Sequence, residues 1–245
     1  MRGRVFLILL LLCGPAAAEQ SILVAVSGNF SVAGARLAEH FQQQTGISVR
    51  TSNASSGRFY AQIVNGAPFD VFLAANADYP ARLEDKGHAV AGSRFTYATG
   101  SLVIYSSTVD DCYRALTDKE AGFVAVGNPG TSPYGDAAST FIERGGLREA
   151  VSGRLVYGEN ILQALQYAVS GNAVVAIAAK SHVNPRDLPS EPTCVVDVPR
   201  GQYDPILQQA VLLTSNRDAA RRFLEFLKTE EAREIIRQEG YEVPE

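Results

Sequence analysis

Residues 53–75 decide the fold, and they read NASSGRFYAQIVNGAPFDVFLAA. Phe59 and Ile63 lie four residues apart, as do the residues that follow them, and this spacing predicts a helix with one apolar stripe. A glycine and a proline then end the helix, and an apolar run of strand length follows at 71–75. The stretch therefore predicts a polar turn, a short helix, a break and a buried strand.

The start of this helix carries Ser55, Ser56 and Gly57. Their hydroxyl and backbone N–H groups lie at a helix N-terminus, where the helix dipole favours an anion. A single serine at such a position is usually only an N-cap, and this interpretation stays open for Ser56. The anion-binding interpretation gains support because the same construction recurs along the chain.

Strands and helices alternate along the whole chain, which predicts an α/β fold with parallel sheets. Strands are expected at residues 22–26, 47–51, 71–75, 101–105, 123–127, 156–157, 174–179, 194–198 and 209–214, and helices include 136–144, 161–169, 218–227 and 230–238. The order restarts after residue 100, so we expect two similar lobes, with the second inserted into the first. Lobe 1 then comprises residues 19–100 plus 212–245, and lobe 2 comprises residues 101–211.

The first 18 residues have the pattern of an export signal. A basic start precedes an apolar run at 5–12, and Ala16-Ala17-Ala18 supplies the small residues of a cleavage site. The apolar run is too short to span a membrane, so we expect cleavage after about Ala18 and a periplasmic protein. Cys13 raises a lipoprotein alternative, although Leu12 precedes it where a small residue is usual.

Composition excludes some classes of function. The chain of 245 residues has a formal net charge of −4 and no basic face, which argues against nucleic acid as a partner. After cleavage two cysteines remain, Cys112 and Cys194, and in an oxidising compartment they predict one disulfide. Two separate buried thiols are the alternative.

Four predicted strand-to-helix turns carry short polar residues or glycine. They are Gly28-Asn29, Ser56-Gly57, Pro133-Tyr134-Gly135 and Asn160-Ile161, two in each expected lobe. Ligands of open α/β sheets bind beyond the carboxyl ends of the strands, so we expect these turns to converge on one cleft. The donors would be backbone N–H groups, the Asn29 amide, the Ser56 hydroxyl and the Tyr134 phenol. Arg58 is the basic residue nearby, so the turns favour a dianion held by neutral donors and helix dipoles.

Several motifs between about Ser21 and Pro244 point to one family. They are Gly28-Asn29-Phe30, Ala54-Ser55-Ser56-Gly57 with Tyr60-Ala61-Gln62-Ile63, the run from Asn65 to Ala74, Asn128-Pro129 with Pro133-Tyr134-Gly135, Gly158-Glu159-Asn160-Ile161, and Gly240-Tyr241. In these motifs the chain resembles the periplasmic molybdate-binding proteins of ABC importers. The resemblance implies a two-lobed type II periplasmic-binding-protein fold that closes on a tetrahedral oxyanion, molybdate or tungstate, in the interlobe cleft.

The resemblance also implies a set of ligand residues. Asn29 and Ser56 would bind the oxyanion from the first lobe, and Tyr134 and the backbone of Ile161 from the second, while Gly28 would contribute at most its N–H. No cofactor is implied. The implied partner is an ABC permease in the inner membrane, and we expect the binding protein to be a monomer.

One position departs from the pattern of some family members. Those members have a tyrosine near the end of the strand that matches residues 174–179, where this chain has Ala179 or Lys180. The chain therefore resembles the subgroup in which Tyr134 supplies the phenol.

An enzyme is the main alternative class, and the sequence argues against it. His40, His88 and His182 are scattered, and none has a cysteine or carboxylate at the spacing of a metal site or a catalytic triad. Ser56 lacks the Gly-x-Ser-x-Gly motif of a hydrolase nucleophile. We therefore expect a binding protein without catalytic activity.

Other oxyanions and other roles stay open. Sulfate and phosphate are also tetrahedral, and protonated phosphate would need an acceptor such as Glu159 or Asp136 at the site. Iron would need clustered tyrosine, histidine or carboxylate side chains, which the four turns lack. A sensor that uses the same fold without transport is a further alternative.

Overall fold

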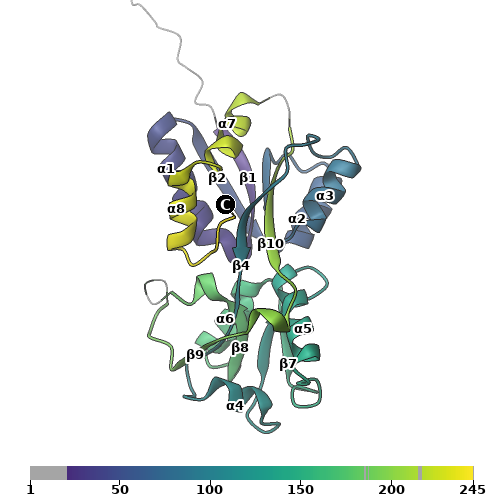
Figure 1. Cartoon of the computed structure of the whole chain (residues 1–245), viewed down its shortest axis with the longest axis vertical. Coiled ribbons are helices and arrows are strands. Elements are labelled where there is room, and N and C mark those ends of the chain that lie inside the picture. The colour runs from purple at the N-terminus through teal and green to yellow at the C-terminus, as the bar shows by residue number, and fades with distance from the viewer. Residues whose placement is uncertain (1–20, 185, 187, 215–216, 245) are drawn as a thin grey trace, which may run out of the picture.

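The structure is a computed structural model and describes residues 21–184, 186, 188–214 and 217–244. The expected export signal, its cleavage site after Ala18 and Cys13 lie outside these residues. Two five-stranded sheets form the centres of two lobes, one above the other in Figure 1. No helix within the described ranges is long and apolar enough to cross a membrane.

The first sheet has the strand order β2-β1-β3-β10-β4. Its strands are β1 (Ser21–Ser27), β2 (Ser48–Ala54), β3 (Val71–Ala74), β4 (Phe95–Gly100) and β10 (Ile206–Leu212). Its helices are η1 (Gly28–Phe30), α1 (Ser31–Thr45), α2 (Ser56–Val64), α3 (Asp78–Asp85), α7 (Asp218–Phe226) and α8 (Glu230–Gln238). This sheet and its helices are the first lobe.

Helices cover both faces of the first sheet, which explains why its inner strands β1 and β3 are almost continuously apolar. Alternate residues of β1 point to opposite faces: Val24 and Val26 pack with α1, α7 and α8, whereas Ala25 packs with α2 and α3 (Figure 1). The predicted apolar stripe of α2 is present, because Phe59 and Ile63 are both buried in this second cluster.

The second sheet has the strand order β7-β6-β8-β5-β9. Its strands are β5 (Leu102–Ser106), β6 (Val124–Gly127), β7 (Leu155–Gly158), β8 (Val175–Ala179) and β9 (Cys194–Asp197). Its helices are α4 (Cys112–Thr117), α5 (Pro133–Arg144), α6 (Ile161–Val169), η2 (Lys180–His182) and η3 (Arg200–Gln202). This sheet and its helices are the second lobe.

Both sheets are mixed, so the prediction of parallel sheets is wrong in part. Strand β10 runs antiparallel to β3 and β4, and β5 runs antiparallel to β8 and β9. The reason is the chain's crossing between the lobes. Strand β5 directly follows β4, and β10 follows η3 after only three residues, so both enter their sheets at the end nearest the other lobe. The other strands of both sheets end at the side that faces the other lobe, so β5 and β10 run in the opposite direction.

Strand β10 begins earlier than the sequence predicted. Pairing with β4 starts at Ile206, whereas the expected strand starts at Gln209 and the expected return to lobe 1 at residue 212. Ile206, Gln208 and Ala210 alternate as buried residues of β10, so the polar side chain of Gln208 faces the interior and breaks the apolar pattern.

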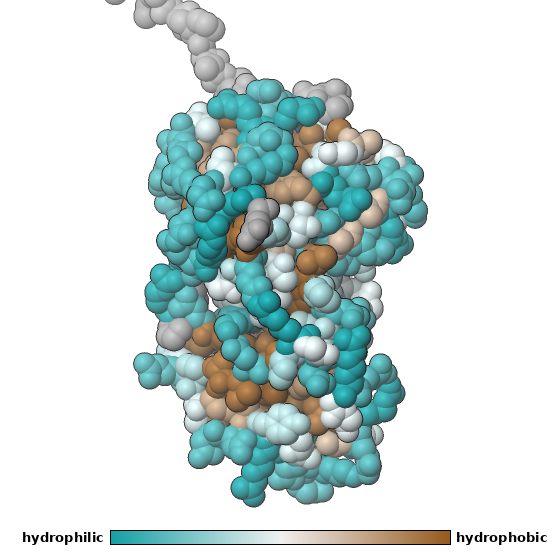
Figure 2. Space-filling view, viewed as in Figure 1, coloured by the Kyte–Doolittle hydropathy of each residue, from teal (hydrophilic) through white to brown (hydrophobic). Residues whose placement is uncertain are grey.

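Cys112 and Cys194 form a disulfide in the second lobe. They are the first residues of α4 and β9, so the bond holds a short helix against an edge strand. Figure 2 shows apolar surface gathered on the lower lobe. The exposed large apolar side chains of this lobe are Tyr113, Phe123, Tyr157, Val195 and Val196.

Candidate functional site

The five residues predicted to bind the ligand lie around one small cavity between the lobes. Gly28, Asn29 and Ser56 line it from the first lobe, and Tyr134 and Ile161 from the second. Its volume is about 10 Å³, close to the minimum for one water-sized group. The other lining residues are Ser27, Ser55, Ala75, Ser132, Pro133 and Asn160. We call this space the central cavity.

The hydroxyl of Ser56 is held by the ends of β1 and β3. Its Oγ lies 2.5 Å from Ser27 Oγ and accepts a hydrogen bond of 2.9 Å from the N–H of Ala75. The N-cap of α2 is Ser55, and Ser56 is the first helical residue. The interpretation of Ser56 as an N-cap is therefore wrong, because its hydroxyl bonds to neighbouring strands and not to its own helix.

The two lobes are in direct contact at the start of α2. The N–H of Gly57 donates a hydrogen bond of 2.9 Å to the carbonyl of Thr131 in the second lobe. A Cβ atom on Gly57 would lie 3.0 Å from the Thr131 backbone and 2.9 Å from Tyr79 Oη. Glycine is therefore what lets the two backbones approach this closely.

The turns of the second lobe are fixed by helix caps. Ser132 accepts from the N–H of Gly135 at the start of α5, and Asn160 accepts from the N–H of Gln163 at the start of α6. Helix α5 begins at Pro133, earlier than the predicted start at residue 136, because proline is well suited to the first helical position. Tyr134 therefore lies in the first turn of a helix and not in a loop.

Ile161 is the first residue of α6. Its N–H belongs to the first turn, whose N–H groups have no partner within the helix. It lines the central cavity together with the first turn of α5. The site is therefore built from helix starts in both lobes, as is usual for anion sites.

Gln208 connects the predicted ligand residues of the two lobes, and the sequence analysis did not identify it. It is fully buried, and its Oε1 accepts from Asn29 Nδ2 at 2.7 Å and from Tyr97 Oη at 3.2 Å. Its Nε2 donates to Tyr134 Oη at 3.2 Å. The available signal was a glutamine within the apolar pattern of a central strand.

The amide of Asn29 points into this network. Its Nδ2 also donates to Tyr241 Oη at 3.2 Å, so both amide hydrogens have protein acceptors. The expected amide donor is therefore already engaged within the protein. The backbone carbonyl of Asn29 accepts from Tyr241 Oη, so the backbone N–H, in the turn after β1, is the donor of this residue left to face a ligand.

Tyr134 is a neutral hydrogen-bond donor at this site. Burial raises its pKa well above the ordinary value of a tyrosine, so the phenol stays protonated at neutral pH. Because Gln208 donates to the phenol oxygen, the phenol's own proton is available to another acceptor. Burial also raises the pKa of the neighbouring Tyr97 and Tyr241.

Known proteins share this architecture. The profile of the family described as bacterial extracellular solute-binding protein matches residues 22–242. The chain belongs to this family. It is 42% identical over 237 residues to the molybdate-binding protein ModA of Azotobacter vinelandii, covering 95% of this chain and 93% of the relative. It is also 42% identical over 233 residues to ModA of Rhodobacter capsulatus, covering 93% and 90%.

Solved structures of solute-binding proteins agree with this assignment. The periplasmic molybdate-binding protein of Azotobacter vinelandii matches with a TM-score of 0.85 and 34% identity, over 91% of this chain and 100% of that one. The sulfate-binding protein SubI of Mycobacterium tuberculosis matches with a TM-score of 0.74 and 17% identity, over 91% and 87%. The predicted family and two-lobed fold are confirmed, and these relatives are binding proteins and not enzymes.

Arg58 of this solute-binding protein does not line the central cavity. It forms an ion pair with Glu159 across the lobes, and both side chains are more than half exposed. Arg58 lies two residues after Ser56, and Glu159 lies two residues before Ile161. The pair therefore joins the lobes beside the cavity, and neither charge enters it.

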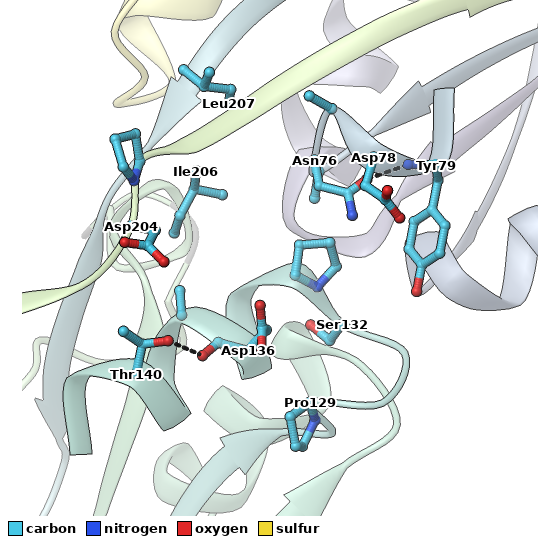
Figure 3. Close-up of a pocket in the computed structure, with 15 residues that line it drawn as sticks. Asn76, Asp78, Tyr79, Pro129, Ser132, Asp136, Thr140, Asp204, Ile206 and Leu207 are labelled. Atoms are coloured by element: carbon cyan, nitrogen blue, oxygen red, sulfur yellow. Dashed lines mark hydrogen bonds between the residues drawn. The ribbon is translucent and has the colours of Figure 1, made fainter. Parts of the chain in front are cut away.

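A larger groove lies next to the central cavity and shares Ala75, Ser132 and Pro133 with it (Figure 3). Its volume is about 450 Å³, and we call it the acidic groove because Asp78, Asp136 and Asp204 line it. No lysine or arginine lines it among the residues the structure describes, so its charge opposes an anion. Nor do the described residues contain a group of three or more His, Cys, Asp or Glu placed to hold a metal ion.

Proposed function

We propose that this solute-binding protein captures molybdate or tungstate and delivers it to an ABC permease in the inner membrane. The observation that carries the proposal is the central cavity, where neutral donors from both lobes surround space for one small group. Organic ligands usually occupy pockets of roughly 300–1,000 Å³, far larger than this cavity. The two ModA relatives, each 42% identical, are named for molybdate binding.

The ligand would be held without a cation. Ser56 and Tyr134 would supply hydroxyl protons, while Asn29, Ile161 and at most Gly28 would supply backbone N–H groups. Anions at helix starts are stabilised by such N–H groups and by the helix dipole. A tetrahedral oxyanion is larger than one water, so we expect the lobes to open from the arrangement seen here to admit it and then to close around it.

Capture and release would follow from movement of one lobe against the other. The chain crosses between the lobes after Gly100 and before Ile206, and these crossings would serve as the hinge. We therefore place the return to lobe 1 at residue 206, and not at 212, because β10 pairs within the first sheet.

The proposal includes the cellular location. We infer a periplasmic monomer with the signal peptide cleaved after about Ala18, on the basis of the sequence pattern and the extracellular family. Mass spectrometry of the exported protein measures the cleavage site. A count of free thiols in the denatured, unreduced protein measures the Cys112–Cys194 bond, and two free thiols would contradict it.

Protonated phosphate is a poorer ligand for this site than a fully ionised oxyanion. Its proton needs an acceptor, and no carboxylate lines the central cavity among the described residues. Glu159 pairs with Arg58 outside the cavity, and Asp136 lines the acidic groove. Glu159 and Asp136, the two carboxylates that could have accepted a phosphate proton, therefore do not line the central cavity.

Calorimetric titration with molybdate, tungstate, sulfate and phosphate at fixed ionic strength tests the proposal. Molybdate and tungstate have nearly the same size and charge, so we expect their affinities to agree within about tenfold. Sulfate is smaller and would leave several hydrogen bonds stretched, which predicts roughly thousandfold weaker binding. Displacement of molybdate by sulfate at comparable concentration would instead identify a general oxyanion-binding protein.

A further inference from the structure

Ser55 occupies the N-cap position of α2 but does not cap it with its side chain. Its carbonyl accepts a hydrogen bond of 3.1 Å from the N–H of Phe59, which begins the helix. Its hydroxyl makes no capping hydrogen bond. A serine at this position ordinarily uses its hydroxyl to accept from an N–H of the first turn, so Ser55 departs from the usual pattern.

A contact between the lobes engages one of the two N–H groups that a cap would use. A capping hydroxyl accepts from the second or third helical N–H, and the second in α2 belongs to Gly57. That N–H already donates to the carbonyl of Thr131 in the second lobe, at 2.9 Å. The second lobe therefore occupies one of the two usual capping donors; the N–H of Arg58 is the other, and the Ser55 hydroxyl caps neither.

The Ser55 hydroxyl is buried at the central cavity. Ser55 is 4% exposed and lines the cavity, and its Oγ has no hydrogen-bond partner in the part of the chain that the structure describes. Burying a hydroxyl without a partner is unfavourable, and most such groups in folded proteins are paired. A ligand that accepts a hydrogen bond from the Ser55 hydroxyl would therefore remove this cost.

We propose that Ser55 donates its hydroxyl proton to the bound oxyanion and is a further ligand residue of this site. The inference rests on the proposed function. Ser56 Oγ is already bonded to Ser27 and Ala75, whereas Ser55 Oγ has no such commitment. An unprotonated oxyanion accepts on all four oxygens, so it can receive this donor together with the others.

Ser55→Ala in the mature chain tests the proposal by two measurements. Calorimetry with sodium molybdate should show about a ten- to hundredfold loss of affinity, as expected for a lost hydrogen bond to a charged group. The melting temperature of the ligand-free variant should be unchanged or higher, because the substitution removes a buried hydroxyl and no hydrogen bond. A cap would lower that temperature.

Thr229→Ala is the matched control. Thr229 is the N-cap of α8, its side chain accepts from the N–H of Ala232 at 3.3 Å, and it does not line the central cavity. We expect the control to lower the melting temperature and leave molybdate affinity unchanged, the opposite of Ser55→Ala.

Two outcomes overturn the inference in distinguishable ways. If the unsubstituted protein binds molybdate and Ser55→Ala binds it equally well, the inference is wrong and the proposed function stands. If the unsubstituted protein binds none of molybdate, tungstate, sulfate and phosphate, the proposed function and the inference both fail.

Discussion

At the scale of single residues, Ser56 makes structural hydrogen bonds and is also a proposed ligand residue. We expect Ser56→Ala to weaken molybdate binding about ten- to hundredfold, since a hydrogen bond to a charged group is lost. The free energy of unfolding should fall by only about 1 kcal/mol, because the N–H of Ala75 still has a second acceptor, Ser27 Oγ, at 3.2 Å. Calorimetry and urea unfolding measure the two effects. A stability loss with unchanged affinity would leave Ser56 a purely structural residue.

The buried tyrosines predict how stability depends on pH. Burial raises the pKa of Tyr134 above its unfolded value of about 10. The folded state then holds the phenol proton more tightly, so its contribution is complete below about pH 10 and is lost as the pH rises further. The stability difference between the unsubstituted protein and Tyr134→Phe should therefore shrink above about pH 10 in urea titrations. A difference that grows with pH would contradict the assignment.

Molybdate affinity should be nearly independent of pH between about 6 and 9. No histidine or carboxylate lines the central cavity among the described residues, and Tyr134 stays neutral over this range. Calorimetry across the range checks this expectation. Tyr134→Phe should lower affinity about tenfold or more throughout, because the phenol proton is lost.

At the scale of elements, β10 carries two adjacent glutamines with different roles. Gln208→Leu removes three hydrogen bonds. It leaves one hydrogen of the Asn29 amide and the Tyr134 phenol oxygen without this buried partner, whereas Tyr97 keeps the carbonyl of Ala74. Each unpaired group costs about 1–3 kcal/mol, so we expect a loss of at least about 2 kcal/mol in the free energy of unfolding, together with weaker molybdate binding.

Gln209→Leu is the control for this strand. Gln209 is half-buried and bonds to Thr96 Oγ1 and Arg94 outside the central cavity. It should lower the free energy of unfolding by less than about 1 kcal/mol and leave affinity unchanged. Urea unfolding and calorimetry of both variants test the pair. Equal effects of the two substitutions would exclude a specific role for Gln208.

The sequence predicted the elements with strong local patterns. Helix α2 has its apolar spacing, and the four polar turns occur at helix starts around the central cavity. The six-residue α4 was not predicted, because so short a helix has too few turns for a periodic pattern. Gln208 was missed for a different reason: its role depends on residues far away in the chain, which local periodicity does not report.

At the scale of the whole molecule, Gly57 controls how closely the lobes approach. We expect Gly57→Ala to oppose closure, because its Cβ would meet the Thr131 backbone, and to weaken molybdate binding about tenfold. Stability of the ligand-free protein should be unchanged or slightly higher, since alanine favours a helix more than glycine does.

Small-angle scattering with and without molybdate measures closure of this variant. Gly201→Ala is the control, because nothing lies within 4 Å of its added Cβ. We expect compaction on adding molybdate to be reduced in Gly57→Ala and normal in Gly201→Ala. Normal compaction and affinity in both variants would show that the close backbone contact is not required.

The insertion of one lobe into the other has a consequence for biogenesis. Under the proposed export the chain emerges from its N-terminus, and the strands of the second sheet all lie between residues 102 and 197. That sheet can assemble as soon as this continuous segment has been translocated. The first sheet must wait, because β10 lies between β3 and β4 and is among the last segments to arrive. Contacts so distant in sequence form slowly, so we expect the lobe that begins the chain to be the last one completed.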